Sequence, residues 1–218
     1  MYATISADIV SSTSLSKDET IELKQKIGEL FTLLEEKYPN FWGRQIKGDY
    51  IECLVPDASK AFRIALIIKT YLKSFSVEEK KGTKNFQTYG ARIAIGIGNM
   101  RIVDKKQGIM DGEAIYLSGR AIENMGTPNK GTFAIEIDNE QCSKSLRIIA
   151  LLTDALINNT TKRQSEVLYY KLLFTKEIDI AEKMGIKQSS VNEHSTLAKW
   201  YCLEEALNYF EQIKFEKR

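Results

Sequence analysis

Asp8 stands at the end of a predicted strand and is followed by a run of hydroxyl side chains, an arrangement that suits phosphate chemistry. Residues 2–9 alternate between two faces, which is the period of a half-buried strand. Ser11, Ser12 and Thr13 follow in a loop that opens a predicted helix. Such a loop offers backbone N–H groups and the positive end of the helix dipole to an anion. We therefore predict that this loop binds phosphate groups.

Asp49 offers a second carboxylate in a similar position. It belongs to a Gly-Asp turn between residues 44–46 and 50–55, which predicts a hairpin. A hard divalent cation such as Mg²⁺ prefers oxygen ligands and is often held by one or two carboxylates together with substrate phosphates. Asp8 and Asp49, on adjacent strand ends, are therefore candidate ligands for Mg²⁺ or Mn²⁺. Ordinary turn chemistry is the alternative, because aspartate is common in such turns.

The elements that must position these side chains follow from the hydrophobic periodicity. Strands are predicted over residues 2–9, 44–46, 50–55, 91–97 and 132–138. Helices are predicted over residues 17–38, 57–75, 113–125, 140–157, 162–173, 176–184 and 188–212. The stretches 76–90 and 98–112 are predicted to be loops. Each strand is apolar on one face and small or polar on the other, which predicts an α+β fold with an antiparallel sheet and helices on one face.

The character of the chain changes near Asn139. All predicted strands precede this residue, and only helices are predicted after it. We therefore predict two domains, residues 1–138 with the sheet and residues 139–218 as an all-α domain.

Three stretches resemble class III adenylate and guanylate cyclase domains. Residues 7–15 (ADIVSSTSL) resemble the opening motif, residues 46–51 (IKGDYI) the second metal-carboxylate hairpin, and residues 112–120 (GEAIYLSGR) the third motif. The resemblance covers roughly residues 1–138. It implies a ferredoxin-like core, a nucleoside triphosphate ligand, Mg²⁺ or Mn²⁺ as cofactor, and a homodimer that shares its site between subunits. The chain also resembles SatD-like bacterial proteins.

The third motif departs from the cyclase pattern. The family has an Asn and, four residues later, an Arg, which act from the partner subunit on ribose and the transferring phosphoryl group. Tyr116 and Arg120 hold these positions, so they are the candidate catalytic pair, although a Tyr hydroxyl does not reproduce the donor and acceptor of Asn. Gln45 and Ile109 replace the family's base-reading Lys and Asp. With the loop hydroxyls, Gln45 and Lys47 remain candidate nucleotide contacts, and the resemblance implies a poor cyclase.

Residues 175–191 (TKEIDIAEKMGIKQSSV) resemble a helix-turn-helix. Ala181 is expected where the helices cross, and Gly185 supplies the positive φ that the turn needs. Candidate DNA contacts are the polar positions around the second helix: Lys187, Gln188, Ser189, Asn192, Ser195 and Lys199. Amide side chains pair with adenine edges, and Ser contacts phosphates. Glu193 is acidic and few cations flank it, so a protein-binding or dimerisation module is the alternative.

Composition limits the function classes. The net charge of +2 gives no global attraction to nucleic acid, so any DNA-binding surface must be local. No apolar run approaches the length of a membrane span, and the three cysteines lack a Cys-x-x-Cys pattern, which favours reduced thiols in the cytoplasm. His194 is the single histidine, so a zinc site built from histidines is disfavoured.

We therefore expect a cytoplasmic, nucleotide-responsive, DNA-binding regulator with a divergent cyclase-like domain that is weakly active or inactive. An active divergent nucleotidyl cyclase with an accessory helical domain is the first alternative, and the missing base readers disfavour it. A protein–protein scaffold is the second, and the presence of both Asp8 and Asp49 disfavours it.

Overall fold

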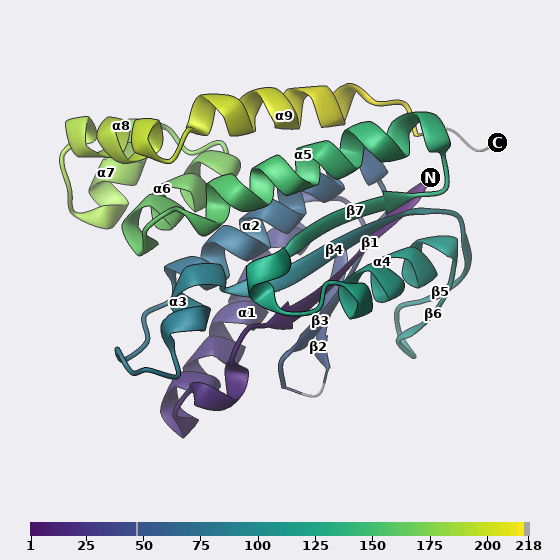
Figure 1. Ribbon diagram of the computed structural model, residues 1–218, viewed down its shortest axis with the longest axis horizontal. Coiled ribbons are helices and arrows are strands. Elements are labelled where there is room, and N and C mark those ends of the chain that lie inside the picture. The colour runs from purple at the N-terminus through teal and green to yellow at the C-terminus, as the bar shows by residue number, and fades with distance from the viewer. Residues whose placement is uncertain (47, 216–218) are drawn as a thin grey trace.

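A mixed five-stranded sheet forms the middle of the molecule (Figure 1). The computed structural model describes residues 1–46 and 48–215, with the backbone alone for residues 140 and 141. In spatial order the strands are β2 (Trp42–Ile46), β3 (Tyr50–Val55), β1 (Tyr2–Ile9), β4 (Ala91–Gly98) and β7 (Phe133–Ile137). The first four pair antiparallel, as predicted, whereas β7 pairs parallel with β4, so the purely antiparallel sheet was wrong.

One face of the sheet is apolar and lies under two long helices. The inward residues of β1 and β4 pair in register, with Ala3 opposite Ile97 and Ile5 opposite Ile95, and all four are fully buried. The helices α1 (Lys17–Lys37) and α2 (Ala61–Ser74) supply the apolar side chains that complete this core. Ser16 caps α1 in a reciprocal capping box with Glu19, which confirms the predicted helix start.

The opposite face carries a helix as well, so the prediction of helices on one face was wrong. The helix α4 (Glu113–Asn124) packs across β1 and β4. Its Ser118 hydroxyl lies 2.9 Å from Thr4 Oγ1 and 3.0 Å from Ser6 Oγ. A Cβ at Gly96 would stand 2.2 Å from the Ala114 carbonyl oxygen. The small side chains on this face therefore make room for a helix backbone.

Three further segments differ from the prediction. The stretch 76–90 contains the helix α3 (Lys84–Tyr89), which buries Phe86. The stretch 98–112 forms a second, two-stranded sheet from β5 (Met100–Asp104) and β6 (Ile109–Gly112). The single helix predicted at 188–212 is α8 (Gln188–Leu197) and α9 (Trp200–Gln212). The break occurs at Lys199, whose φ of 59° is left-handed.

The C-terminal part is helical, as predicted, and it shares its core with the sheet. It also contains α5 (Glu140–Asn158), α6 (Lys162–Leu172) and α7 (Glu177–Met184). Figure 1 shows α9 lying alongside α5 above the sheet. The ring centroids of Phe62 in α2 and Phe210 in α9 are 5.2 Å apart. Arg63 Nε and Glu211 Oε1 form an ion pair between the same helices at 2.6 Å. The boundary near residue 139 stays a prediction, while one buried cluster joins both parts.

Three single turns of 3-10 helix connect these elements: η1 (Ser12–Ser14), η2 (Ala58–Lys60) and η3 (Pro128–Lys130). Of the helices in the described residues, none combines the length and the hydrophobicity that crossing a membrane requires.

Candidate functional site

Asp8 is held by an arginine from the neighbouring strand. The β1–β4 register places Asp8 opposite Arg92. Arg92 Nε donates to Asp8 Oδ2 at 3.0 Å, and Arg92 Nη2 donates to the same oxygen. Arg92 Nη1 donates to the Gly126 carbonyl at 2.7 Å, just beyond the end of α4. The guanidinium therefore neutralises the first candidate metal ligand and ties it to the helix on that face.

Asp49 lies at the same edge of the sheet. Its backbone carbonyl accepts from the N–H of Ile9, the residue after Asp8, at 3.0 Å. Its Oδ2 accepts from the Ser12 hydroxyl at 2.9 Å. The structure thus brings Asp8, Asp49 and the predicted phosphate loop together. Gln45 instead donates to the Gly48 carbonyl inside the hairpin, and Lys47 lies outside the described residues.

The loop after β1 has the geometry of an anion-binding turn. Ser11 adopts the left-handed conformation, with φ 53° and ψ 34°, before the turn η1. The Val10 N–H donates to the Gly90 carbonyl at 3.0 Å, whereas the N–H groups of Ser11, Ser12 and Thr13 have no backbone acceptor among the described residues. Successive N–H groups at such a turn form a concave site for an anion. The loop can therefore accept a phosphate beside two carboxylates.

The donor atoms suit a hard cation, while the charge balance weakens the site. Both Arg92 bonds go to Oδ2 of Asp8, and the Ser12 bond goes to Oδ2 of Asp49, so none of these bonds within the described residues uses an Oδ1. Arg92 cancels one of the two negative charges. Within the described part of the chain, no group of three or more Asp, Glu, His or Cys side chains could surround a metal ion. Asp8 and Asp49 would hold Mg²⁺ or Mn²⁺ through oxygens alone, and a bound phosphate would supply further ligands.

The candidate pair on α4 lies apart from the two aspartates within one chain. Tyr116 donates its hydroxyl proton to Asp111 Oδ1, and Arg101 bonds the other oxygen of that carboxylate. These bonds, with Tyr116 the larger contributor, lower the pKa of Asp111. Since a helix rises 1.5 Å per residue, Tyr116 is roughly 12 Å from the end of α4 that approaches Arg92.

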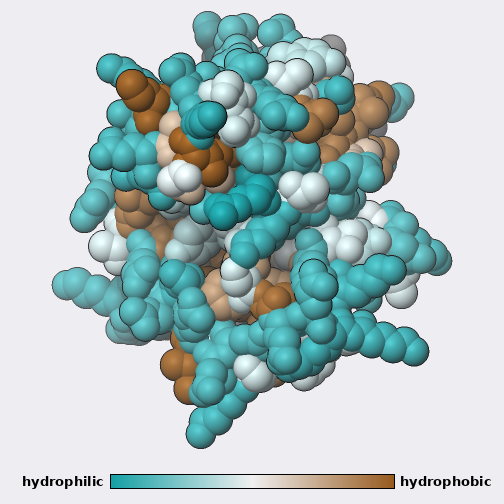
Figure 2. Space-filling model, turned by 90° about the vertical axis from the view of Figure 1, so that its left-hand side faces the viewer, coloured by the Kyte–Doolittle hydropathy of each residue, from teal (hydrophilic) through white to brown (hydrophobic). Residues whose placement is uncertain are grey.

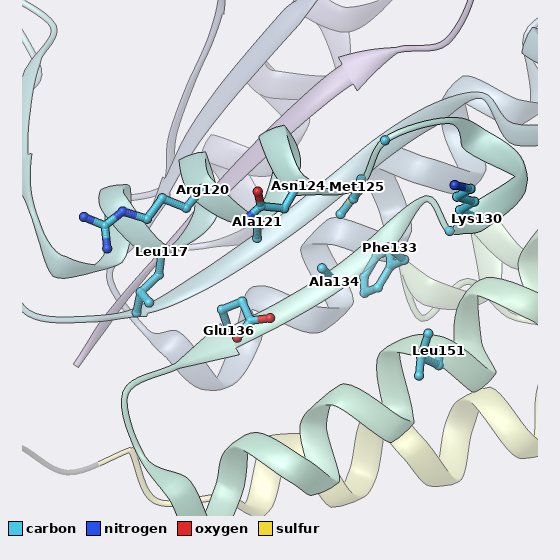
Figure 3. A pocket seen from close by; sticks show the side chains of 12 residues that line it. Leu117, Arg120, Ala121, Asn124, Met125, Lys130, Phe133, Ala134, Glu136 and Leu151 are labelled. Carbon is cyan, nitrogen blue, oxygen red and sulfur yellow. The ribbon is translucent and has the colours of Figure 1, made fainter.

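Arg120 is exposed and lines a groove of about 640 Å³ between α4, β7 and α5 (Figure 3). In this view Leu117 and Ala121 lie on α4, Ala134 and Glu136 lie on β7, and Leu151 projects from α5. The groove follows the β7 edge, whereas Asp49 belongs to the β2–β3 hairpin at the other edge of the sheet. Arg120 therefore lies toward the sheet edge opposite Asp49 of its own chain.

The predicted helix, turn and second helix at residues 176–191 are present. Gly185 is left-handed, with φ 62°, at the end of α7. Ala181, Met184 and Val191 are buried in a small cluster where α7 and α8 meet. The candidate contacts that are exposed are Lys187, Gln188, Ser189, Asn192 and Lys199. Ser195 is only 6% exposed and faces the interior, so it is removed from the set.

Sequence reasoning missed Arg92 and Asp111 as site residues. Arg92 shares a strand face with small residues, Ala94 and Gly96, and is the one charged side chain on that face. This signal marks Arg92 as unusual, but its partner follows only from the strand register. Asp111 could be found only once the segment 98–112 was recognised as a hairpin that returns to α4.

No protein-family model matches the chain, and no curated protein matches it either. Among solved structures, the chain is similar to one described as "Structure of a bacterial light-regulated adenylyl cyclase". The two are 16% identical, with a TM-score of 0.40, and the similarity covers 62% of this chain and 74% of the other. A likeness at this level supports no inference about activity.

Proposed function

We propose that this protein is a nucleotide-responsive, DNA-binding regulator with a divergent cyclase-like sensor that is weakly active or inactive. One observation carries the proposal: Arg92 binds Asp8 beside a free phosphate loop, while Arg120 and Tyr116 lie elsewhere in the chain. A site of this kind is better suited to binding a triphosphate than to converting it into a cyclic nucleotide. The loop N–H groups would bind phosphate oxygens, and Asp8 and Asp49 would share a cation with the triphosphate.

We expect weak cyclase activity because the site lacks a donor that would stabilise the negative charge that develops on the transferring phosphoryl group. Removing one positioned donor typically costs about 10²–10³ in rate. Tyr116 donates to Asp111 and is committed there, so it does not replace the donor and acceptor of an Asn. Arg120 is exposed and lies toward the sheet edge opposite Asp49, so we expect it to act on the aspartate site of a second chain. We therefore propose a homodimer through the sheet-bearing parts, and light scattering that finds a monomer at micromolar concentration would speak against it.

Nucleotide binding tests the first half of the proposal. Wild-type protein should bind ATP or GTP only with Mn²⁺ or Mg²⁺ and yield little cyclic product. Asp8→Asn and Asp49→Asn should abolish binding, whereas Asp18→Asn, an exposed aspartate in the first turn of α1, should not. Unchanged binding in both site variants would remove the site. Strong cyclic-nucleotide synthesis that is lost in Asp8→Asn would establish the active-cyclase alternative.

DNA binding tests the second half. Gln188 and Asn192 project from the start and middle of α8 with exposed amides, as a bidentate contact to adenine requires. Gln188→Ala and Asn192→Ala should each weaken the binding free energy for a specific DNA sequence by about 1–3 kcal/mol. Lys199→Ala should instead reduce the salt dependence. Asn208→Ala, which removes an exposed amide on α9, is the control.

A protein-binding role for the same helices is the second candidate, and a specific observation favours it. Ile178 in α7 is 63% exposed and Leu197 in α8 is 55% exposed. Apolar side chains on a recognition surface suit a protein partner better than a phosphate backbone. Failure of random duplexes to yield an enriched sequence would favour this reading.

A further inference from the structure

Two lysines of α2, Lys69 and Lys73, are buried beneath the helical part of the chain, with exposed fractions of 0% and 2%. Lys69 Nζ donates to the carbonyls of Tyr89 and Ala91 and to the Thr132 hydroxyl, at 2.8–3.1 Å. It also lies 3.8 Å from Asp154 Oδ1. All three N–H groups of Lys69 and its charge therefore have partners, as a buried ammonium requires.

Lys73 is less well compensated. Its Nζ donates to the carbonyls of Thr88 and Asn158, the latter at 3.0 Å, which leaves one of three N–H groups for a further acceptor. Among the described residues, no carboxylate oxygen forms an ion pair with it within 4.0 Å; Asp154 pairs with Lys69 instead. Burial lowers the pKa of Lys73 to about 8, so the side chain is still largely charged at neutral pH. A buried charge without a close counter-ion is costly.

Lys73 and the two residues whose carbonyls it bonds, Thr88 and Asn158, line a cavity of about 430 Å³. On another wall Lys162 Nζ bonds the Ser76 hydroxyl. Lys162 begins α6, where Thr161 and Gln164 use each other's N–H groups in a capping box. The backbone N–H of Lys162, which lines the cavity, is one of the groups that a helix start leaves unpaired, so it remains for a ligand.

We propose that this cavity binds the phosphate group of a small phosphorylated molecule. Two lysines, Ser76 and the start of α6 border one space, and their donors together match the several acceptor oxygens of a phosphate. Glu79 is the one carboxylate among the residues that line the cavity, and it is exposed, which favours a compact phosphate over a large polyanion. A phosphate would also supply the counter-charge that Lys73 lacks.

The location gives this site a regulatory meaning. The cavity lies between the segment 73–88, which belongs to the sheet-bearing part, and residues 158–162, which connect α5 to α6. Figure 2 looks onto the side of the molecule where α3, α6 and α7 lie, and this face is mostly hydrophilic. A bound phosphate would bridge the two parts at that junction. None of the cavity residues belongs to the Asp8–Asp49 site, so the inference does not depend on the proposed function.

Calorimetric titration of the full chain with inorganic phosphate tests the proposal, at pH 8 and constant ionic strength in chloride. In the absence of divalent cations, which binding at the Asp8–Asp49 site requires, we expect saturable binding of one phosphate, weaker binding of acetate, and net proton uptake because a phosphate raises the pKa of Lys73. Lys73→Met and Lys162→Ala should each weaken binding roughly ten- to a hundredfold, the effect of losing a charge-assisted hydrogen bond. Lys81→Ala, at an exposed lysine of the same loop that does not line the cavity, should bind like wild type.

Lys162 is a surface residue, so its variant tests the site even where Lys73→Met fails to fold. A phosphate signal that both Lys73→Met and Lys162→Ala weaken comes from this cavity, because neither lysine belongs to the loop beside Asp49. Absence of saturable binding, equal affinity for acetate, or binding that persists in Lys162→Ala would overturn the proposal.

Discussion

Arg92 determines how much negative charge the two aspartates can offer to a cation. Its guanidinium donates twice to one oxygen of Asp8 and once to the Gly126 carbonyl, so three of its five N–H groups fix it in place. The side chains of Arg92 and Asp8 are only 27% and 24% exposed, so solvent screens this pair less than a surface pair. Without the positive charge of Arg92, both aspartates would offer an uncompensated negative charge to a cation.

Arg92→Gln should therefore bind Mn²⁺ more tightly than wild type. One charge about 4 Å from the ion is worth about 1 kcal/mol even at the dielectric constant of water, which is roughly fivefold in Kd. Electron paramagnetic resonance of free Mn²⁺ measures the change. Arg101→Gln, which removes an exposed arginine bound to Asp111, is the control. Equal Mn²⁺ affinity in wild type and Arg92→Gln would contradict the proposed role of Arg92.

Lys69 gives the fold a pH dependence with a defined sign. Burial lowers its pKa from 10.5 to about 7, Asp154 opposes this shift, and Lys73 adds to it. Above that value the folded chain loses a proton that the unfolded chain keeps, so the free energy of unfolding rises with pH and falls as pH returns toward 7. The free energy of unfolding can rise by at most about 1.4 kcal/mol per pH unit for each lysine that titrates in this way.

Urea unfolding between pH 7 and 8.5 in phosphate-free buffer measures this slope. The range ends there because burial raises the pKa of Cys53, so its thiol opposes the rise at higher pH. Lys69→Met should flatten the dependence. A wild-type free energy of unfolding that falls over this range would contradict the assignment.

At the scale of the elements, the contact between α4 and the sheet positions the third motif. A Cβ at Gly96 would approach the Ala114 carbonyl oxygen and, at 2.5 Å, the Ser118 nitrogen, and these are backbone atoms that cannot rotate away. Gly96→Ala should therefore destabilise the protein by about 1–3 kcal/mol, as overpacking does. Gly28→Ala is the matched control, because Gly28 is an exposed residue of α1 and nothing lies within 4 Å of a Cβ added there. This substitution should stabilise the protein by about 0.5–1 kcal/mol. Thermal unfolding that ranks the variants in the opposite order would refute this packing argument.

Some of these elements could be predicted from the sequence, and others could not. Helices with a clear apolar stripe and a local signal, such as α1 with Ser16 or α7 with Gly185, were predicted close to their observed ends. The helix α3 was missed because Phe86 is its one buried residue, which produces no periodicity. The position of α4 on the far face and the parallel pairing of β7 depend on tertiary contacts that strand patterns alone do not encode. The Asp8–Arg92 pair required the register for the same reason.

At the scale of the whole molecule, the helical part is attached to the sheet-bearing part through α2. Arg63 donates to Glu211, and its guanidinium lies over the Phe174 ring at 4.2 Å. The Met1 amino group donates to the Phe215 carbonyl at 3.2 Å, so the start of β1 is tied to the segment that follows α9. A change in one part therefore has a direct route to the other through packed side chains.

Phe210→Ala should destabilise the entire chain by about 3–5 kcal/mol and keep a single unfolding transition. Phe210 is fully buried and contacts Phe62 in α2, so its loss weakens the core that both parts share. Circular dichroism and tryptophan fluorescence should report coincident transitions. Tyr209→Ala, at a side chain 49% exposed, should cost far less. Two separate transitions in wild type would contradict a shared cooperative core.

DNA binding by the full chain should be measured with and without a nucleoside triphosphate and Mn²⁺. Selection on random duplexes should yield an enriched sequence, and adding the nucleotide should change the affinity for it. Asp49→Asn should still bind that sequence but lose the response to nucleotide. No enriched sequence, or an affinity that is the same with and without nucleotide in wild type, would contradict the claim that this chain is a nucleotide-responsive DNA-binding regulator.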